Sequence, residues 1–298
     1  MGVRIGTNEP GGTFNVQGAA LADMLAETAG MEVELLTTTN ASVANAGHLD
    51  RDEADFGFMA SNWIGRAVAG RLPFEHPIAL RMAAPANAGP MFFITLADSP
   101  IRTVADLRGR RVAVGVEDGG MTQHIRTMFG VLGISFDAFT PVYVSFPEGA
   151  DLLVAGEVDA QWQCPVPNAL MTSLSQRAHV RVVPYAAGQL EKLLAEIEFY
   201  KPAVVEKGAF RGVNADMAQL GVLNIIATHE RVDEALVCKL VTAMVEHTED
   251  LARRCPLYRS LALLFDPLRT AGAAALECGG VPLHPGALRA YRETGLLD

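Results

Sequence analysis

The sequence predicts an α/β fold in which mostly parallel sheets are flanked by helices. Short apolar runs alternate with segments of helical periodicity, and a second series of the same kind begins near residue 90. Segments rich in Gly, Ser, Thr and Asn follow the apolar runs. Such alternation is typical of parallel sheets whose crossover helices cover the faces. A chain of 298 residues with 50% hydrophobic content is long enough for two such units.

The first series is regular. Its apolar runs predict strands at residues 3–5, 32–36, 54–58 and 77–82, and the segments between them predict helices at 14–28, 42–50 and 62–69. Ser42 is expected to be the N-cap of the second helix, because serine at that position accepts a hydrogen bond from the first turn.

The second series begins after residues 84–90, whose Pro, Gly and Asn content predicts a turn. Strands are expected at 91–95, 111–114, 141–145, 158–162 and 180–183, and a helix runs to Leu132. Periodicity fades over 203–217. An apolar run at 220–227 could pair with 91–95, and one long helix is predicted over 232–253.

Composition excludes several classes of function. The net charge of −10 and the pI of about 5.2 disfavour binding to nucleic acid. No apolar run approaches the roughly 20 residues that span a bilayer. The four cysteines, at 164, 238, 255 and 278, lack C-x-x-C spacing, and no two of the seven histidines have metal-ligand spacing. We expect no metal and no cofactor. Free thiols are the simpler interpretation, with a Cys255–Cys278 disulfide as the alternative in an oxidising compartment.

Five loops are placed where open α/β sheets bind ligands, between the end of a strand and the start of a helix. They cover residues 10–14, 37–42, 60–63, 117–122 and 163–168, and none contains Lys or Arg. Their backbone and side-chain donors suit a carbonyl, a carboxylate or another acceptor. The candidate ligand-binding residues are Gly12, Thr13, Phe14, Thr39, Asn40, Ser42, Ser61, Asn62, Trp63, Gly120, Met121, Thr122, Gln161, Trp162, Gln163 and Pro165.

Each loop also has a purely structural interpretation. Thr13, Ser42 and Thr122 could only cap their own helices, and Trp63 and Trp162 could be core side chains. The first loop, GTNEPGGT at residues 6–13, has the spacing of a phosphate-binding loop, but Gly12 replaces the lysine. It therefore suits a modest polar group better than a triphosphate.

Signatures of catalysis are absent. The sequence has no G-x-S-x-G, H-E-x-x-H or G-x-G-x-x-G motif in a suitable context. We therefore expect no enzyme and no catalytic residue. If the scaffold did carry an activity, His124 and Asp118 would be the candidates.

Several segments, taken in order, resemble the TAXI group of TRAP-transporter solute-binding proteins. These are GTNEPGGTFNVQGAALADML at 6–25, TNAS at 39–42, EADFGF at 53–58, TVADLRGRRVAVG at 103–115 and VPLHPG at 281–286. The resemblance implies a type II periplasmic-binding fold with two lobes and a ligand cleft between them. The expected lobes are residues 1–86 with 204–298, and residues 87–203, with hinge strands near 90–96 and 219–228.

The resemblance also implies a periplasmic receptor that passes a small solute to the membrane permease subunits of a TRAP transporter, without spanning the membrane itself. The alternative is a cytoplasmic ligand-sensing module of the same fold, which we would expect if Met1 were the native start and no leader were removed. Known ligands of the family include glutamate-like and 2-oxoglutarate-like carboxylates.

Two departures affect ligand specificity. Residues 60–63 read ASNW where the family has Gln-Ser-Asp, and 161–167 are more aromatic and polar than usual. We slightly favour a planar heterocyclic or aromatic ligand. Trp63 and Trp162 would stack on it, and the amides of Asn40, Asn62, Gln161 and Gln163 would meet its edges.

Overall fold

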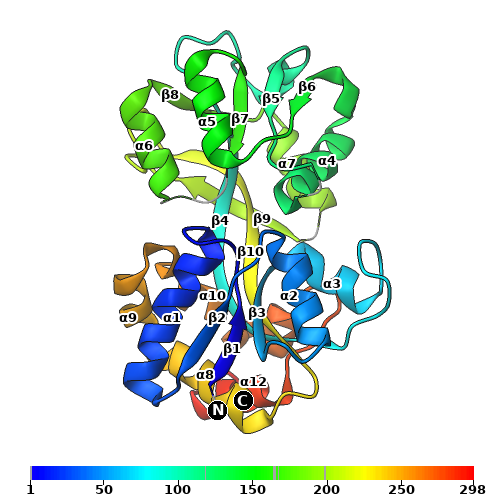
Figure 1. Ribbon diagram of the computed structural model, residues 1–298, viewed down its shortest axis with the longest axis vertical. Coiled ribbons are helices and arrows are strands. Elements are labelled where there is room, and N and C mark those ends of the chain that lie inside the picture. The colour runs from blue at the N-terminus through cyan, green and yellow to red at the C-terminus, as the bar shows by residue number, and fades with distance from the viewer. Residues whose placement is uncertain (1, 118, 164–165, 167, 198) are drawn as a thin grey trace. The chain divides into compact units, whose positions relative to one another are not determined.

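The computed structural model describes residues 2–117, 119–163, 166, 168–197 and 199–298. The chain divides into two compact units (Figure 1). Unit 1 comprises Met1–Ala88 and Leu223–Asp298, and unit 2 is the continuous segment Gly89–Val222. Two long strands, β4 (Leu80–Leu96) and β10 (Met217–His229), contribute residues to both units. Unit 1 is therefore built from the two ends of the chain.

Unit 1 contains a sheet with the strand order β2-β1-β3-β10. β1 is parallel to β2 and β3, whereas β10 is antiparallel to β3. The remaining elements of this unit are β1 (Val3–Gly6), α1 (Thr13–Ala29), β2 (Val33–Leu36), α2 (Ala41–Asp50), β3 (Phe56–Ala60), α3 (Ser61–Val68), α8 (Glu234–Glu246), α9 (Thr248–Arg254), η3 (Pro256–Tyr258), α10 (Leu261–Phe265), α11 (Leu268–Ala271), η4 (Gly272–Leu276) and α12 (Pro285–Glu293).

Helix α1 shows why this sequence folds as it does. Its apolar stripe includes Phe14, Leu21 and Leu25, which are buried, and burying each such side chain contributes about 1.5–3 kcal/mol. The helix ends at Gly30, which adopts a left-handed φ of 60° that glycine tolerates best. The adjacent strand β3 is buried along its whole length, as expected for a strand covered on both faces.

Unit 2 has the strand order β4-β7-β5-β6, with β8 pairing with β4 and β9 pairing with β10. β5 is parallel to β6 and β7. The other elements of this unit are η1 (Val104–Leu107), β5 (Arg111–Ala113), α4 (Gly120–Leu132), η2 (Phe136–Ala138), β6 (Thr140–Val142), α5 (Phe146–Ala155), β7 (Ala160–Gln163), α6 (Ala169–Arg177), β8 (Val180–Val183), α7 (Gln189–Glu196) and β9 (Tyr200–Val205).

The turn predicted at residues 84–90 is wrong, because β4 runs through this segment without interruption. Pro85 and Pro90 restrict the residues before them to extended conformations, and proline itself is compatible with an extended backbone. Pro85, Asn87 and Pro90 are buried rather than exposed as in a surface turn. Residues 84–90 therefore have the amino-acid composition of a turn, but their backbone is an extended strand.

The single helix predicted over 232–253 is also wrong. His247 has non-helical dihedrals, φ −115° and ψ 27°, and it separates α8 from α9. Glu249 and Asp250 lie in the first turn of α9, where negative charge stabilises the start of a helix. These acidic residues indicate the start of a second helix, but the apolar periodicity continues across both helices and therefore predicted a single one.

Residues 204–222, which the sequence assigned to lobe 1, pack with unit 2 instead. β9 was not anticipated, and it pairs with the first half of β10 in the register Met217↔Val205. Val205, Phe210 and Val213 belong to the hydrophobic core of unit 2 together with Phe92. Phe92 and Phe210 stack with their ring centroids 6.0 Å apart.

No helix in the described part of the chain is both long and apolar enough to cross a membrane. Cys238 and Cys255 are buried and carry free thiols. The disulfide considered for Cys255 is therefore not formed. Burial raises the pKa of the Cys255 thiol, which favours its protonated form.

Candidate functional site

The carboxyl ends of three parallel strands meet at one edge of the unit 1 sheet. Gly6 at the end of β1 pairs with Leu36 of β2 and with Gly57 of β3. Each strand then leads into a helix, at Thr13 for α1, Ala41 for α2 and Ser61 for α3. The first-turn N–H groups of these helices have no partner within their own helix, and the helix dipoles favour an acceptor there. This edge is the candidate site of unit 1.

The loop before α1 is shaped by its own internal contacts. Gly11 has a φ of 81°, and a Cβ on Gly12 would lie 2.0 Å from Nδ2 of Asn8. Oδ1 of Asn8 accepts a hydrogen bond from the backbone N–H of Asn15 at 2.7 Å. Gly11 thus has a left-handed conformation that favours glycine, and a side chain at position 12 would displace the Asn8 amide from its bond with Asn15. Phe14 is buried and stacks on Phe58 with a centroid distance of 5.7 Å.

Ser42 is not the N-cap of α2, contrary to the prediction. The N-cap is Asn40, which makes no side-chain capping bond, and both Asn40 and Thr39 are exposed. Oγ of Ser42 instead accepts a hydrogen bond from the N–H of Ala60 at 3.1 Å. The sequence could not show this, because the partner lies on another strand. Ser42 fixes the start of α2 against the end of β3.

Asn45 performs a similar role one turn later. Its Nδ2 donates to the backbone oxygens of Thr7 at 3.1 Å and Phe58 at 2.9 Å, so one amide holds the ends of β1 and β3 together. Its Oδ1 is buried and has no hydrogen-bond partner among the described residues.

Ser61, Asn62 and Trp63 form the first turn of α3. Ser61 and Trp63 are buried, and Asn62 is half-buried. The Trp63 ring is 4% exposed, meets Phe74 edge-on at 6.3 Å and lies 5.0 Å below the Arg66 guanidinium. These contacts are packing within unit 1. A role for the ring in stacking on a ligand stays a prediction.

Unit 2 has a comparable edge. Ala113 of β5 pairs in parallel with Gln161 of β7, and the two strands lead towards α4 and α6. Thr122 does not cap α4 through its side chain. Its Oγ1 donates to the oxygens of Val114 at 2.9 Å and Val116 at 2.7 Å, which fixes α4 against the strand end. Gly120 and Met121 are half-buried beside it. Pro165 and Asp118 lie outside the described residues.

The end of β7 carries three of the predicted residues on two faces. Trp162 is completely buried and packs against Phe93 at 4.5 Å. Gln161 points to the other face, where its Nε2 donates to the oxygen of Phe146 at 2.8 Å. Gln163 shares that face with Gln161, because side chains alternate along a strand.

Buried polar atoms without hydrogen bonds are concentrated at these residues. Apart from Arg181 and His284, the described side chains that carry such atoms are Gln17, Asn45, Ser61, Asn62, Gln161, Trp162, Gln163 and Gln219. An unsatisfied buried donor or acceptor costs about 1–3 kcal/mol. All eight side chains are uncharged, so they are suited to neutral polar groups of a ligand or to ordered water.

Gln17 and Gln219 were missed at the level of sequence. Gln17 lies within the apolar stripe of α1, between Phe14 and Leu21, and is 0% exposed. Gln219 directly precedes the apolar run at 220–227 and is 1% exposed. The available signal was a long polar side chain within an apolar stripe for Gln17, and directly beside an apolar run for Gln219.

The surroundings of His124 give little support for a catalytic role of this residue. Its Nδ1 lies 2.9 Å from the hydroxyl of Tyr200, and both side chains are buried. Burial lowers the pKa of His124 to about 4 and raises that of Tyr200. At neutral pH both groups are therefore uncharged. No cluster of metal-ligating side chains is found in the described ranges.

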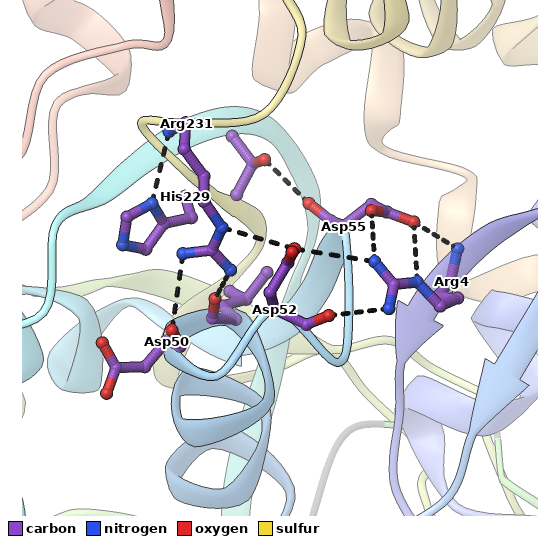
Figure 2. A network of polar contacts seen from close by, with 8 residues as sticks. Arg4, Asp50, Asp52, Asp55, His229 and Arg231 are labelled. Atoms are coloured by element: carbon purple, nitrogen blue, oxygen red, sulfur yellow. Dashed lines mark hydrogen bonds and ion pairs between the residues drawn. The ribbon is translucent and has the colours of Figure 1, made fainter.

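Figure 2 shows a charged cluster in unit 1. Its residues lie near the start of β1 and just before β3, whereas the candidate site lies at the carboxyl ends of these strands. Arg4 near the start of β1 binds Asp55 through Nη2 at 2.9 Å, and Arg231 binds Asp52 through Nε at 3.3 Å. Arg231 also donates to the backbone oxygen of Leu49. The cluster joins β1, the segment after α2 and the segment after β10, so it has a structural explanation.

Solved structures with the same fold include binding proteins and a sensor domain. MatC from Rhodopseudomonas palustris, determined with bound malate, is 16% identical, with 86% of this chain and 88% of that chain covered and a TM-score of 0.59. A periplasmic sulfonate-binding protein, SsuA, from Methylobacillus flagellatus KT is 13% identical over 99% and 95% of the chains, with a TM-score of 0.51.

A histidine kinase sensor domain with similarity to periplasmic binding proteins is 16% identical over 88% and 94% of the chains, with a TM-score of 0.51. At these identities the likeness establishes the fold, which is the one predicted from sequence, a mixed α/β fold of the periplasmic-binding type. Residues 5–295 match the NMT1-like family, and the chain therefore belongs to that family.

Proposed function

We propose that the protein is the extracytoplasmic solute receptor of a TAXI-type TRAP uptake system, which captures a small organic solute and releases it unchanged to the permease. The observation that carries this proposal is a set of uncharged, buried side chains, most of them at or beside the strand ends of both units, each of which keeps at least one polar atom without a hydrogen bond among the described residues. Such groups suit reversible binding better than catalysis. The family and the fold support a receptor, and the TAXI segments at 6–25 and 103–115 support the transporter type.

The proposed ligand is planar and largely neutral rather than a glutamate-like or 2-oxoglutarate-like carboxylate. The five predicted loops contain neither Lys nor Arg, so a dicarboxylate would have only helix N-termini and hydroxyls to balance its charge. Unpaired amide atoms on Asn62, Gln161 and Gln163 can each meet the edge of a heterocycle.

Ligand capture in this proposal involves closure of the two units about β4 and β10. Both strands contribute residues to both units, which is the arrangement that a hinge between them needs. The proposed hinge segments are residues 90–96 and 219–228, and the proposed location is the periplasm.

Native mass spectrometry of the purified protein, followed by a thermal-shift screen, tests the receptor function. The screen should contain uracil, nicotinamide and benzamide beside glutamate and 2-oxoglutarate. At least one solute should raise Tm and be recovered chemically unchanged. If no solute stabilises the protein while a solute is turned over, the receptor proposal fails.

The second candidate is a ligand-sensing module, which the likeness to a histidine kinase sensor domain favours. The two candidates differ in their partner. If the chain is a TRAP receptor, reconstitution of the protein in proteoliposomes with TRAP permease subunits should give solute uptake that depends on it. Ligand binding without any such uptake, but with regulation of an adjoining signalling protein, would instead support the sensor.

A further inference from the structure

Two glutamines of unit 2, Gln163 and Gln219, are buried with both amide atoms unpaired. Gln163 is 0% exposed and Gln219 is 1% exposed, and neither the oxygen nor the nitrogen of either amide has a hydrogen-bond partner within the described part of the chain. A protein can tolerate one buried polar atom that lacks a hydrogen bond. Four such atoms on two side chains are a substantial cost that a specific occupant would remove.

Both glutamines lie on the same face of the sheet. Gln163 of β7 is directly opposite Phe92 of β4, and Phe92 belongs to the hydrophobic core on that face. Met217 packs against the same core, and Gln219 shares the face with Met217 because side chains alternate along β10. The two amides therefore border one apolar cluster.

The two residues also lie at a similar level along the sheet. β4 is the strand between β7 and β10, which separates the two backbones by about two strand spacings, roughly 10 Å. A Cβ on Gly221 would lie 3.2 Å from the oxygen of Gly89, which sets β10 against β4 near the start of unit 2. Gln219 lies two residues before Gly221 on β10, deeper within the unit 2 part of that strand, and is thereby brought towards the level of Phe92.

We infer that Gln163 and Gln219 form a subsite that recognises an amide group of the ligand. In such a group an N–H donor lies beside a C=O acceptor. This inference rests on the proposed receptor function. A primary amide presents one acceptor and two donors, so it can bond both members of an amide, lactam, imide or ureide group. A carboxylate offers only acceptors and would leave the two glutamine oxygens unpaired.

The chemistry of the surroundings agrees with this assignment. Phe92, which lies opposite Gln163, is fully buried and stacks on Phe210, so the surroundings of the amides are apolar and aromatic. The partnered member of the set, Gln161, is held by the oxygen of Phe146, and a Cβ on Gly149 of α5 would lie 2.7 Å from its Nε2. Gln161 is thus fixed by α5, whereas the side-chain amides of Gln163 and Gln219 have no hydrogen-bond partner among the residues that the structure describes.

The test uses pairs of probes that differ only in an amide or an acid: nicotinamide and nicotinate, benzamide and benzoate, glutamine and glutamate. Isothermal titration calorimetry is carried out on the full chain and on Gln163→Leu and Gln219→Leu. In whichever pair binds, the affinity for the amide should be at least about tenfold higher than the affinity for the acid. Each variant should lower the affinity for the amide by a similar factor. Gln176→Leu, at an exposed position of α6, is the matched control and should change nothing.

Stability of the ligand-free protein provides the second measurement. Replacing an unpaired buried amide by leucine should leave the unfolding midpoint unchanged or raise it. Lower midpoints with unaltered affinities would mean that internal water already satisfies the amides, and the inference would be overturned. Tighter binding of the acids would also overturn it, while leaving the receptor proposal intact. Failure of the protein to bind any solute would instead count against the receptor itself.

Discussion

The side-chain Nδ2 of Asn224 donates a hydrogen bond to Oδ1 of Asn87 at 3.1 Å, and both side chains are buried. Asn87 lies on β4 and Asn224 on β10, each within two residues of the point where its strand enters unit 2. The pair therefore fixes the relative position of the two strands just before they leave unit 1.

Truncating either asparagine should destabilise the protein by about 1–3 kcal/mol, because the remaining amide stays buried without its partner. The double variant Asn87→Ala/Asn224→Ala should lose less than the sum of the two single variants. Urea unfolding of all four proteins measures this. Strict additivity would show that the two amides do not depend on each other.

Asp55→Ala should cost more stability than the loss of an ordinary surface ion pair. The Asp55 carboxylate accepts from the backbone N–H of Arg4 at 2.8 Å and from its Nε and Nη2, and it is mostly buried (Figure 2). We expect a loss of about 1–3 kcal/mol. Asp151→Ala is the matched control, since Asp151 binds Arg177 at the surface and should contribute under about 1 kcal/mol. Equal effects in chemical denaturation would contradict the assignment.

The pH dependence of stability should contain a contribution from His124. Its pKa falls from 6.5 to about 4 in the folded protein because burial disfavours the charged ring. Between these values the unfolded chain binds a proton that the folded chain does not. This stability is therefore fully present above pH 6.5 and is lost as pH falls towards 4, by up to about 3 kcal/mol.

Comparison with His124→Gln isolates this effect. Burial also lowers the pKa of His229 and His284, and these groups titrate in the same direction in both proteins. Unfolding free energies at several pH values from 4 to 8 should show a steeper acid loss for the wild type. Parallel curves would mean that His124 takes up a proton as readily in the folded state as in the unfolded one.

The two tryptophans should respond differently to substitution. Trp63→Ala removes a buried ring from its contacts with Phe74 and Arg66 and should cost about 3–5 kcal/mol. Trp162→Phe keeps a ring against Phe93 but removes an Nε1–H that has no partner among the residues described, so the ligand-free protein should change by under about 1 kcal/mol.

Ligand affinity provides the independent readout for both variants. A loss of affinity in Trp162→Phe would identify Nε1 as a donor to the solute. If Trp63→Ala weakened binding without lowering the unfolding midpoint, the ring would be a ligand-stacking surface rather than a packing element. Affinity is best measured with whichever solute the thermal-shift screen identifies.

Local patterns in the sequence predicted most of the helices and strands of the first series. The helix expected at 14–28 is observed as Thr13–Ala29, because its apolar stripe and its glycine stop signal are both local. β9 was not predicted, since its stability depends on pairing with β10, and β10 follows it only after a segment without periodicity. The turn at 84–90 was wrong because composition alone does not distinguish a turn from a buried strand that contains proline.

The candidate site was predictable to a similar extent. The sequence indicated which strand ends lead into helix starts, and so it identified Ser42 and Thr122. It could not indicate that Ser42 binds Ala60, or that Thr122 binds Val114, because both partners come from the tertiary fold. Gln17 and Gln219 were missed because their significance lies in burial without a partner, and burial is known only once the neighbouring elements are placed.

The discontinuity of unit 1 has a consequence for synthesis of the protein. During translation β3 emerges early, but β10, which covers one of its edges, is made more than 150 residues later. Until then that edge presents unpaired backbone groups, which are prone to pair with other chains. Unit 2, by contrast, is one uninterrupted segment that can fold as soon as it leaves the ribosome. The nascent chain should therefore depend on a chaperone that shields β3 until β10 arrives.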